Sequence, residues 1–314
     1  MRVARYTQND APQWDKFVED SKNGTFLFLR GYMDYHSDRF QDHSLMFYDN
    51  KNRLTAIMPA NEKDGILYSH QGLTYGGFVL SPKSKIIEVG ELFETTIKYL
   101  RTLNFTEWHY KQIPTVYHKL PAEEDEYWLW RHGAVMTSCN VMSAIDLQSE
   151  IPFSKRKRTY FNKFCRTGYV IDMHASLRDL WPILEQNLME TYKATPVHSI
   201  REIEMLQRRF PNNILCSTIK NQDGITIAGT VLYISDSVIR AQYISASREG
   251  KEKHALDFLF LSLVEHYSKT GGFRYFEFGT SMNEDGILFN SGLVHQKETL
   301  GGRCIACKTY SITL

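Results

Sequence analysis

The sequence lacks the runs and motifs that mark several large classes of protein. No apolar run approaches the ~20 residues that a membrane-spanning helix needs, and the segment from Met1 to Gln8 has no apolar signal region. The eleven histidines form neither an H-x-x-x-H nor an H-E-x-x-H pattern, and the chain has no G-x-S-x-G and no Walker loop. The sequence therefore gives no support for a transmembrane protein, a metal centre, a serine hydrolase or a P-loop enzyme.

An excess of one charge is missing as well. The 37 lysines and arginines nearly balance the 36 aspartates and glutamates, for a formal net charge of +1, so no overall field points to nucleic acid or to a membrane surface. The five cysteines are odd in number and scattered, which favours a reducing, cytoplasmic setting over a disulfide framework. Cys304 and Cys307 form a C-x-x-C pair, but the sequence has no second pair to complete a zinc site, and we expect both to be packing residues.

The chain does have the length and composition of a globular protein with two domains or one large one. It has 314 residues, of which 42% are hydrophobic. Strand-like and helix-like segments alternate along it, which predicts an α+β fold with mixed sheets flanked by helices. Because Ser149-Glu-Ile-Pro152 has the composition of a linker, we predict domains at 1–150 and 151–314.

The segment 238–302 is the most informative. Residues 238–247 predict a strand, residues 254–269 a mostly buried helix, and residues 273–278 a second strand. Strand, helix and strand in this order form a βαβ unit, whose two strands lie parallel and usually adjacent. The loop 248–253 then precedes a helix N-terminus, where backbone N–H groups and the helix dipole can hold an anion.

The order of elements repeats along the chain. A predicted helix near Ile86 and a strand near Phe105 are matched by a helix near His254 and a strand near Phe273, with an offset of 168 in both cases (254 − 86 and 273 − 105). In each half a pair of hairpin strands precedes the helix. Sequence identity between the halves is negligible, so the repeat is one of architecture, as two similar domains in tandem would show.

Three motifs in the segment 238–302 carry a family resemblance. They are Tyr243-Ile-Ser-Ala-Ser247, the aromatic strand Gly272-Phe-Arg-Tyr-Phe-Glu-Phe-Gly279, and Gly292-Leu followed by Lys297 and Gly301-Gly302. Together they resemble the GNAT acyltransferases, and more closely their FemABX-like branch, in which two GNAT domains are fused. Typical acetyl-CoA users have Arg/Gln-x-x-Gly-x-Gly/Ala in the pyrophosphate loop, whereas Arg248-Glu-Gly-Lys-Glu-Lys253 has one glycine.

The resemblance implies a cytoplasmic N-acyltransferase, in which an amine attacks an activated acyl carbonyl. The donor would be an acyl-CoA such as acetyl-CoA, or the aminoacyl-tRNA used by the cell-wall members of the family. The near-zero net charge and the lack of a long helical arm favour the acyl-CoA. The acceptor would be an amine of a small molecule or of a cell-envelope precursor, and no metal is implied. The single-glycine loop keeps open a second class of function, a non-catalytic binding module with the GNAT fold.

The resemblance also places the donor between the strands 238–247 and 273–278 and indicates catalytic candidates. Lys297 could neutralise charge on the acyl oxygen or on a phosphate, Glu277 could act as a general base for the amine, and Tyr243 could protonate a leaving thiolate. Each has a simpler alternative. Lys297 would be a surface lysine, Glu277 a partner in a structural salt bridge, and Tyr243 a core residue.

Five further residues are expected to hold the donor. Backbone N–H groups near Ser245 and Ala246 would bind the carbonyl oxygen, and Arg248, Gly250 and Lys251 would bind the pyrophosphate.

A basic helix is predicted at the head of the second domain, as in FemABX-like proteins. Its basic face consists of Lys155, Arg158, Asn162 and Arg166. This face is either a solvated surface or a contact for a donor phosphate, an anionic acceptor or tRNA.

In the first domain, the segment 70–77 occupies the position at which a GNAT domain would bind its donor. It carries no basic residue apart from His70, so we expect that this half does not bind a phosphate-bearing donor. We expect it to form one wall of the acceptor cleft, through Tyr75, Gly76, Gly77, Trp108 and Tyr110. The alternative is that these aromatic side chains pack the domains together.

Overall fold

The computed structural model divides into two compact units. Unit 1 consists of Met1–Asn140 together with Ala306–Leu314, and unit 2 consists of Val141–Ile305. The structure describes residues 1–150, 153–165, 167–283 and 286–314. The units differ from the predicted ranges, 1–150 and 151–314, at residues 141–150 and at residues 306–314.

Two long strands explain this difference. The second half of β9 (Val135–Asp146) pairs with β14 (Tyr275–Thr280), which belongs to unit 2. The last residues of β15 (Arg303–Thr313) pair antiparallel with β8 (Glu107–Lys111), which belongs to unit 1. In both cases the partner strand is remote in sequence, so local patterns do not reveal the pairing.

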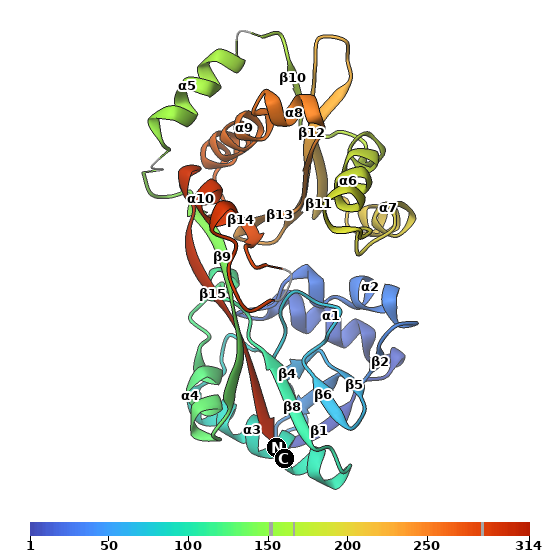
Figure 1. Ribbon diagram of the computed structural model, residues 1–314. Helices are drawn as coiled ribbons and strands as arrows, with labels where there is room; N and C mark the ends of the chain where they lie inside the picture. The colour runs from blue at the N-terminus through green and yellow to red at the C-terminus, as the bar shows by residue number, and fades with distance from the viewer. Residues whose placement is uncertain (151–152, 166, 284–285) are drawn as a thin grey trace. The chain divides into compact units, whose positions relative to one another are not determined.

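Unit 1 has two sheets (Figure 1). The first has the order β1-β3-β4-β7, with β1 at Arg2–Arg5, β3 at Leu45–Tyr48, β4 at Leu54–Met58 and β7 at Val79–Leu80. The second has the order β15-β8-β6-β5-β2, with β6 at Ile66–Tyr68, β5 at Asn61–Lys63 and β2 at Gln41–Asp42. The helices are α1 (Ala11–Asp20), α2 (Arg30–Met33), α3 (Ile86–Thr102) and α4 (Glu124–Arg131).

The core of unit 1 lies between α3 and the sheets. α3 begins after Lys85, whose N–H donates to Glu88 Oε2 at 3.0 Å and so satisfies one of the free donors at the helix start. Its apolar residues recur at helical spacing and pack with the large side chains of the strands. The core includes Phe47, Phe78, Val89, Phe93, Ile97, Leu100 and Trp108.

Unit 2 has one mixed sheet in the order β10-β11-β12-β13-β14-β9. The strands are β10 (Val170–Asp172), β11 (Ile214–Lys220), β12 (Thr226–Ile234) and β13 (Val238–Ala246), with β14 and β9 as given above. The helices are α5 (Lys155–Phe164), α6 (Leu177–Tyr192), α7 (Ile200–Arg209), α8 (Arg248–Glu252), α9 (Ala255–Thr270) and α10 (Ser291–Thr299). In Figure 1, α9 covers one face of β12 and β13, and α6 covers the other, with α7 next to α6 against β11.

The predicted βαβ unit is confirmed. β13 and β14 are parallel neighbours, and α9 between them begins one residue after the predicted start, because His254 has a left-handed backbone with φ of 56°. The polar turn expected at 248–253 is in fact the short helix α8. Ser247 caps α8 by accepting the N–H of Gly250 at 3.2 Å.

The repeat of elements is also present. In unit 1, β6 and β8 are parallel neighbours on either side of α3, as β13 and β14 are on either side of α9. The helices start 169 residues apart (255 − 86) and the strands 168 apart (275 − 107). Within the described ranges, no helix combines the length and the apolar character that crossing a bilayer requires.

Candidate functional site

The two strands predicted to flank the donor separate where the cavity begins. β13 and β14 are paired at Val238↔Tyr275, Ile239↔Phe276 and Arg240↔Glu277. Beyond Arg240, β13 continues along β12, while β14 continues along β9 and its end is contacted by Lys297 of α10. The space between them is part of a cavity of about 490 Å³, lined entirely by residues of unit 2.

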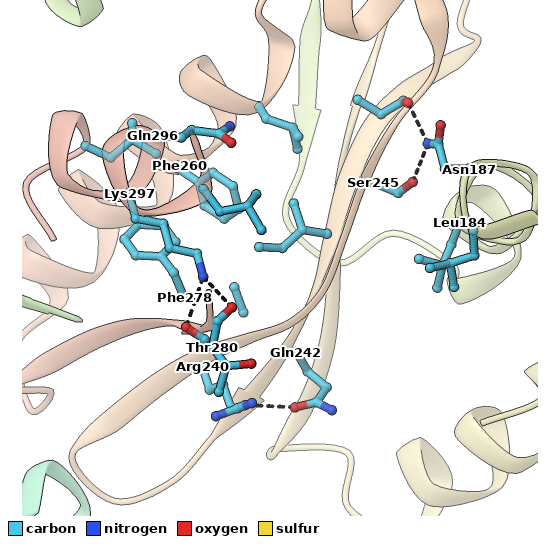
Figure 2. A pocket seen from close by; sticks show the side chains of 18 of the residues that line it. Leu184, Asn187, Arg240, Gln242, Ser245, Phe260, Phe278, Thr280, Gln296 and Lys297 are labelled. Carbon is cyan, nitrogen blue, oxygen red and sulfur yellow. Dashed lines mark hydrogen bonds between the residues drawn. The ribbon is translucent and has the colours of Figure 1, made fainter. Parts of the chain in front are cut away.

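The cavity is lined by α6 on one side and by α9 and α10 on the other (Figure 2). Its apolar lining includes Leu184, Leu188, Ile244, Phe260, Leu293 and Leu300. Its polar lining includes Asn187, Gln242, Ser245, Thr280 and Gln296, and its charged lining residues are Arg240, Lys251 and Lys297. Among the described residues, no aspartate or glutamate lines it.

Lys297 reaches from α10 to the end of β14, as Figure 2 shows. Its Nζ donates to the carbonyl oxygens of Gly279 at 3.0 Å and Thr280 at 2.8 Å, and to Ser281 Oγ at 2.7 Å. The residue is 8% exposed. Burial lowers its pKa to about 8, an effect that the Glu277 carboxylate opposes and the Arg240 guanidinium reinforces. Lys297 is therefore a buried cation on the cavity wall and not a surface lysine.

Glu277 lies behind this wall and does not line the cavity. It is fully buried, and its Oε2 forms an ion pair with Arg240 Nη1 at 2.8 Å. Its Oε1 accepts the N–H of Gly279. The salt bridge anticipated as the alternative to a general base is therefore present, since both carboxylate oxygens are engaged by the protein.

Tyr243 contributes to a different part of unit 2. Its hydroxyl forms a hydrogen bond with Nδ1 of His198, and its ring meets the Trp181 ring edge-on at 5.3 Å between centroids. Tyr243 is not among the residues that line the cavity. Tyr243 packs near α6 and the start of α7, and its role in protonating a leaving thiolate stays a prediction.

At the end of β13 the site contains a residue that the sequence did not reveal. Asn187 of α6 donates through Nδ2 to Ser245 Oγ and to the carbonyl oxygen of Ala246, both at 2.7 Å. Its Oδ1 accepts a hydrogen bond from Lys251 Nζ. Asn187 thus joins three of the predicted donor-binding positions.

The three residues of the predicted pyrophosphate loop have different surroundings. Lys251 lines the cavity. The Arg248 side chain is 94% exposed and pairs with Glu252 within α8, at 3.1 Å. Gly250 is buried against the backbone of Ile227, so closely that a Cβ there would collide with the Ile227 carbonyl oxygen. Glycine is therefore required at 250 by packing, whatever the loop binds.

The residues expected to form an acceptor wall pack into unit 1. Trp108 and Tyr110 have no exposed surface, and Tyr75 has 1%. The Tyr110 hydroxyl donates to Asp125 Oδ2 at 2.8 Å and accepts the N–H of Phe78 at 2.9 Å. Tyr75 meets the rings of Phe28 and Tyr117. In this structure their side chains offer no surface to an acceptor, because core residues surround them.

The two adjacent glycines have packing reasons as well. Gly76 donates to the carbonyl oxygen of Lys111 at 2.9 Å and lies against the backbone of Ser69. Gly77 has φ of +84°, and a Cβ there would come within 2.5 Å of the Tyr110 ring. The close backbone approach expected of this pair is therefore to neighbours within unit 1.

Two other predictions concern the basic helix and metal binding. On α5, Lys155, Arg158 and Asn162 are exposed, and Lys157 pairs with Asp257 of α9. Arg166 lies outside the described residues. In the part of the chain that the structure describes, no three His, Cys, Asp or Glu side chains gather as a metal site would need. Cys304 is exposed and Cys307 buried, on opposite faces of β15.

Solved structures share this architecture over the whole chain. FemX aligns with a TM-score of 0.71 at 10% identity, covering 100% of this chain and 98% of the other. L-PGS from Bacillus licheniformis aligns with a TM-score of 0.62 at 15% identity, covering 97% and 91%. A tandem GNAT protein from the clavulanic acid biosynthesis pathway aligns with a TM-score of 0.56 at 11% identity, covering 99% and 98%.

These likenesses establish the fold. The chain has the fold of FemX and of the tandem GNAT protein, as the motifs in the segment 238–302 predicted. No family model matches the chain, and no curated protein matches it.

Proposed function

We propose that this chain, whose fold is that of FemX and the tandem GNAT protein, is a transferase that moves an acyl or aminoacyl group from an activated ester or thioester to an amine. The observation that carries the proposal is the position of Lys297. A buried cation lies at the open end of two diverging parallel strands, beside a cavity large enough for an acyl group and part of its carrier.

In the proposed reaction the amine attacks the carbonyl carbon, and negative charge develops on the carbonyl oxygen. A fixed cation in a partly enclosed cavity stabilises that charge more than the same cation would in water. The nitrogen–carbonyl bond forms, the bond to the thiolate or alkoxide breaks, and the leaving group takes up the proton that the amine gives up. Because the Lys297 ammonium donates to three fixed oxygens, we assign it an electrostatic role.

Two residues at the other end of the cavity are proposed to hold the donor. Lys251 and Asn187 lie side by side there, and Asn187 fixes the end of β13 at Ser245 and Ala246. The backbone at these two positions is the proposed contact for the donor carbonyl. Glu277 is proposed to keep the wall behind Lys297 in place, with the general-base role as the alternative that a Glu277→Gln variant tests.

The carrier of the acyl group is proposed to be coenzyme A, with tRNA as the alternative. The short helix α8 stands where a glycine-rich pyrophosphate loop would be, so a phosphate contact would depend on Lys251 and on side chains nearby. The amine is proposed to belong to a small molecule or to a cell-envelope precursor. One similar structure is the C-terminal domain of a putative lysylphosphatidylglycerol synthetase from Agrobacterium fabrum, which keeps a lipid acceptor within this class.

A thermal-shift experiment tests the donor. Coenzyme A and acetyl-CoA are compared with an aminoacyl-tRNA and with the free tRNA, and a bound donor raises the melting temperature in proportion to ln(1 + [L]/Kd). Lys251→Ala should weaken the shift strongly, whereas Arg248→Ala should change it little, since Arg248 points into solvent and pairs with Glu252.

The possible results of the thermal-shift experiment lead to different conclusions. A shift with aminoacyl-tRNA alone would replace the CoA version of the proposal by its alternative. No shift with any donor up to millimolar CoA and no turnover would leave a non-catalytic binding module with the GNAT fold.

A further inference from the structure

We propose that the cavity between β13 and β14 accepts an acyl group that is neutral or negatively charged and rejects one that carries a positive charge. This inference rests on the proposed function and adds the chemical class of the group transferred. It follows from the charges on the cavity wall and from what pairs with each of them.

The charged residues on the wall are all cations. Arg240, Lys251 and Lys297 line the cavity, and within the described ranges no carboxylate does. Glu277 lies behind the wall, and its ion pair with Arg240 offsets one of the three charges. The four groups together leave a net charge of +2 (three cations and one anion).

Both lysines line the cavity, and the groups that accept their hydrogen bonds are neutral. Lys297 donates to two backbone carbonyls and to Ser281 Oγ. Lys251 donates to the side-chain oxygen of Asn187. In the part of the chain that is described, neither lysine forms an ion pair of its own.

A cationic acyl group would therefore lose water on entry and find no carboxylate to replace it. Burial of an unpaired charge is costly, and repulsion from the two lysines adds to that cost at the reduced dielectric of a partly enclosed site. A neutral hydrocarbon chain would instead meet the apolar lining of Leu184, Leu188, Ile244 and Phe260. A terminal carboxylate would gain from the same lysines.

Three thioesters of nearly equal size isolate this effect. Butyryl-CoA and β-alanyl-CoA have the same number of heavy atoms in the acyl group and differ by one positive charge, while succinyl-CoA ends in a carboxylate. Dissociation constants are measured by calorimetry on the full chain. The constant for β-alanyl-CoA should exceed that for butyryl-CoA by a factor of about ten or more. Succinyl-CoA should bind at least as well as butyryl-CoA. Because all three thioesters share the coenzyme A carrier, its contribution to binding cancels in the ratio of their dissociation constants.

A carboxylate placed on the wall should weaken the preference. Gln296 lines the cavity from α10, so Gln296→Glu adds a carboxylate without changing size. It should lower the β-alanyl to butyryl ratio severalfold. The matched control is Gln148→Glu, an exposed position outside the cavity lining, which should leave the ratio unchanged.

The outcomes separate this inference from the proposed function. If the thioesters bind and all three dissociation constants agree, or if β-alanyl-CoA binds best, the selectivity is overturned and the transferase proposal stands. If binding is found with aminoacyl-tRNA and with no acyl-CoA, the selectivity is overturned, because every aminoacyl group carries an α-ammonium, while the transferase proposal stands in its aminoacyl form. If neither carrier binds, the proposed function fails and this inference fails with it.

Discussion

Arg240 and Glu277 form an ion pair at the last paired register of β13 and β14, with Nη1 2.8 Å from Oε2. Glu277 also accepts the N–H of Gly279, where φ is +73°. The same glycine presents its carbonyl oxygen to Lys297. The ion pair therefore lies at the point where the strands separate, and one residue links it to the lysine on the cavity wall.

Removing one partner of this pair should destabilise the fold. Glu277→Gln removes the carboxylate that forms an ion pair with the buried Arg240 guanidinium, and we expect a loss of about 3 kcal/mol in the free energy of unfolding, measured with urea. The double variant with Arg240→Met should lose less than the sum of the two single variants. The control is Glu265→Gln, which breaks the exposed pair with Lys269 and should cost less than about 0.5 kcal/mol. Equal losses for Glu277→Gln and Glu265→Gln would contradict the structural role.

Loss of the Lys297 charge should reduce turnover with little change in donor affinity. Lys297→Met keeps most of the side chain and removes the ammonium, and we expect kcat to fall by about 10²-fold or more. A wild-type kcat in Lys297→Met would show that the active site lies elsewhere.

The pH dependence of turnover should report the same lysine. Burial lowers its pKa to about 8, so the ammonium, and with it the rate, should be lost as the pH rises through about 8. Glu277 is the anion that favours the charged form and Arg240 the cation that opposes it. The alkaline limb should therefore move to lower pH in Glu277→Gln. If the alkaline limb of the rate profile has the same position in Glu277→Gln as in the parent, a group other than Lys297 titrates there.

Gly77 should tolerate alanine less well than Gly65 does. Both have positive φ, of +84° and +75°, but a Cβ at 77 would meet the Tyr110 ring, whereas a Cβ at 65 has nothing within 4 Å. The backbone cost of about 1 kcal/mol is common to both. Displacing the ring should add roughly 1–3 kcal/mol for Gly77→Ala. Equal unfolding free energies for the two variants would show that the ring moves aside freely.

His70 should make unit 1 sensitive to acid. Its imidazole is 3% exposed and stacks on His36, and burial lowers its pKa to about 3, with His36, Arg30 and Lys111 adding to the effect. As the pH falls from about 6.5, the unfolded chain takes up a proton that the folded chain does not. Stability is therefore lost on acidification, by about 2 kcal/mol at pH 5 from this residue.

An asparagine at position 70 removes that proton and suits the positive φ of 64°. Urea unfolding of His70→Asn should accordingly show a flatter pH dependence between pH 6.5 and 5 than the parent. The exposed His174→Asn serves as the control and should leave the slope as it is. A parental slope in His70→Asn would contradict a neutral, buried imidazole.

The sequence predicted the elements whose signals are local. The βαβ unit was found because the apolar periodicity of 254–269 and the composition of its two strands lie within one stretch, and the observed α9 is Ala255–Thr270. The motif around Lys297 marked the lysine, although not its three oxygen partners, which come from β14 and the residue after it.

What the sequence did not reveal depends on contacts between remote segments. Asn187 reaches β13 from α6 across some sixty residues of chain, as the bond to Ala246 shows, and no local pattern marks a polar residue for such a role. Tyr75 and Trp108 were predicted to line a cleft and are core residues instead. An aromatic residue suits either place, and the sequence alone does not show which neighbours surround it. Here their neighbours are Phe28, Tyr117, Phe78 and Phe93.

The return of the chain to unit 1 affects the order in which the protein can be completed on the ribosome. β8 acquires its β15 partner when residues 309–313 have been synthesised, after every strand of unit 2 is available. Unit 2 is contiguous and can close its sheet as it emerges, whereas unit 1 must wait with one edge of β8 open. Unit 1 is thus synthesised first and completed last. Removing a few residues from the C-terminus would therefore damage unit 1 and leave the cavity of unit 2 intact.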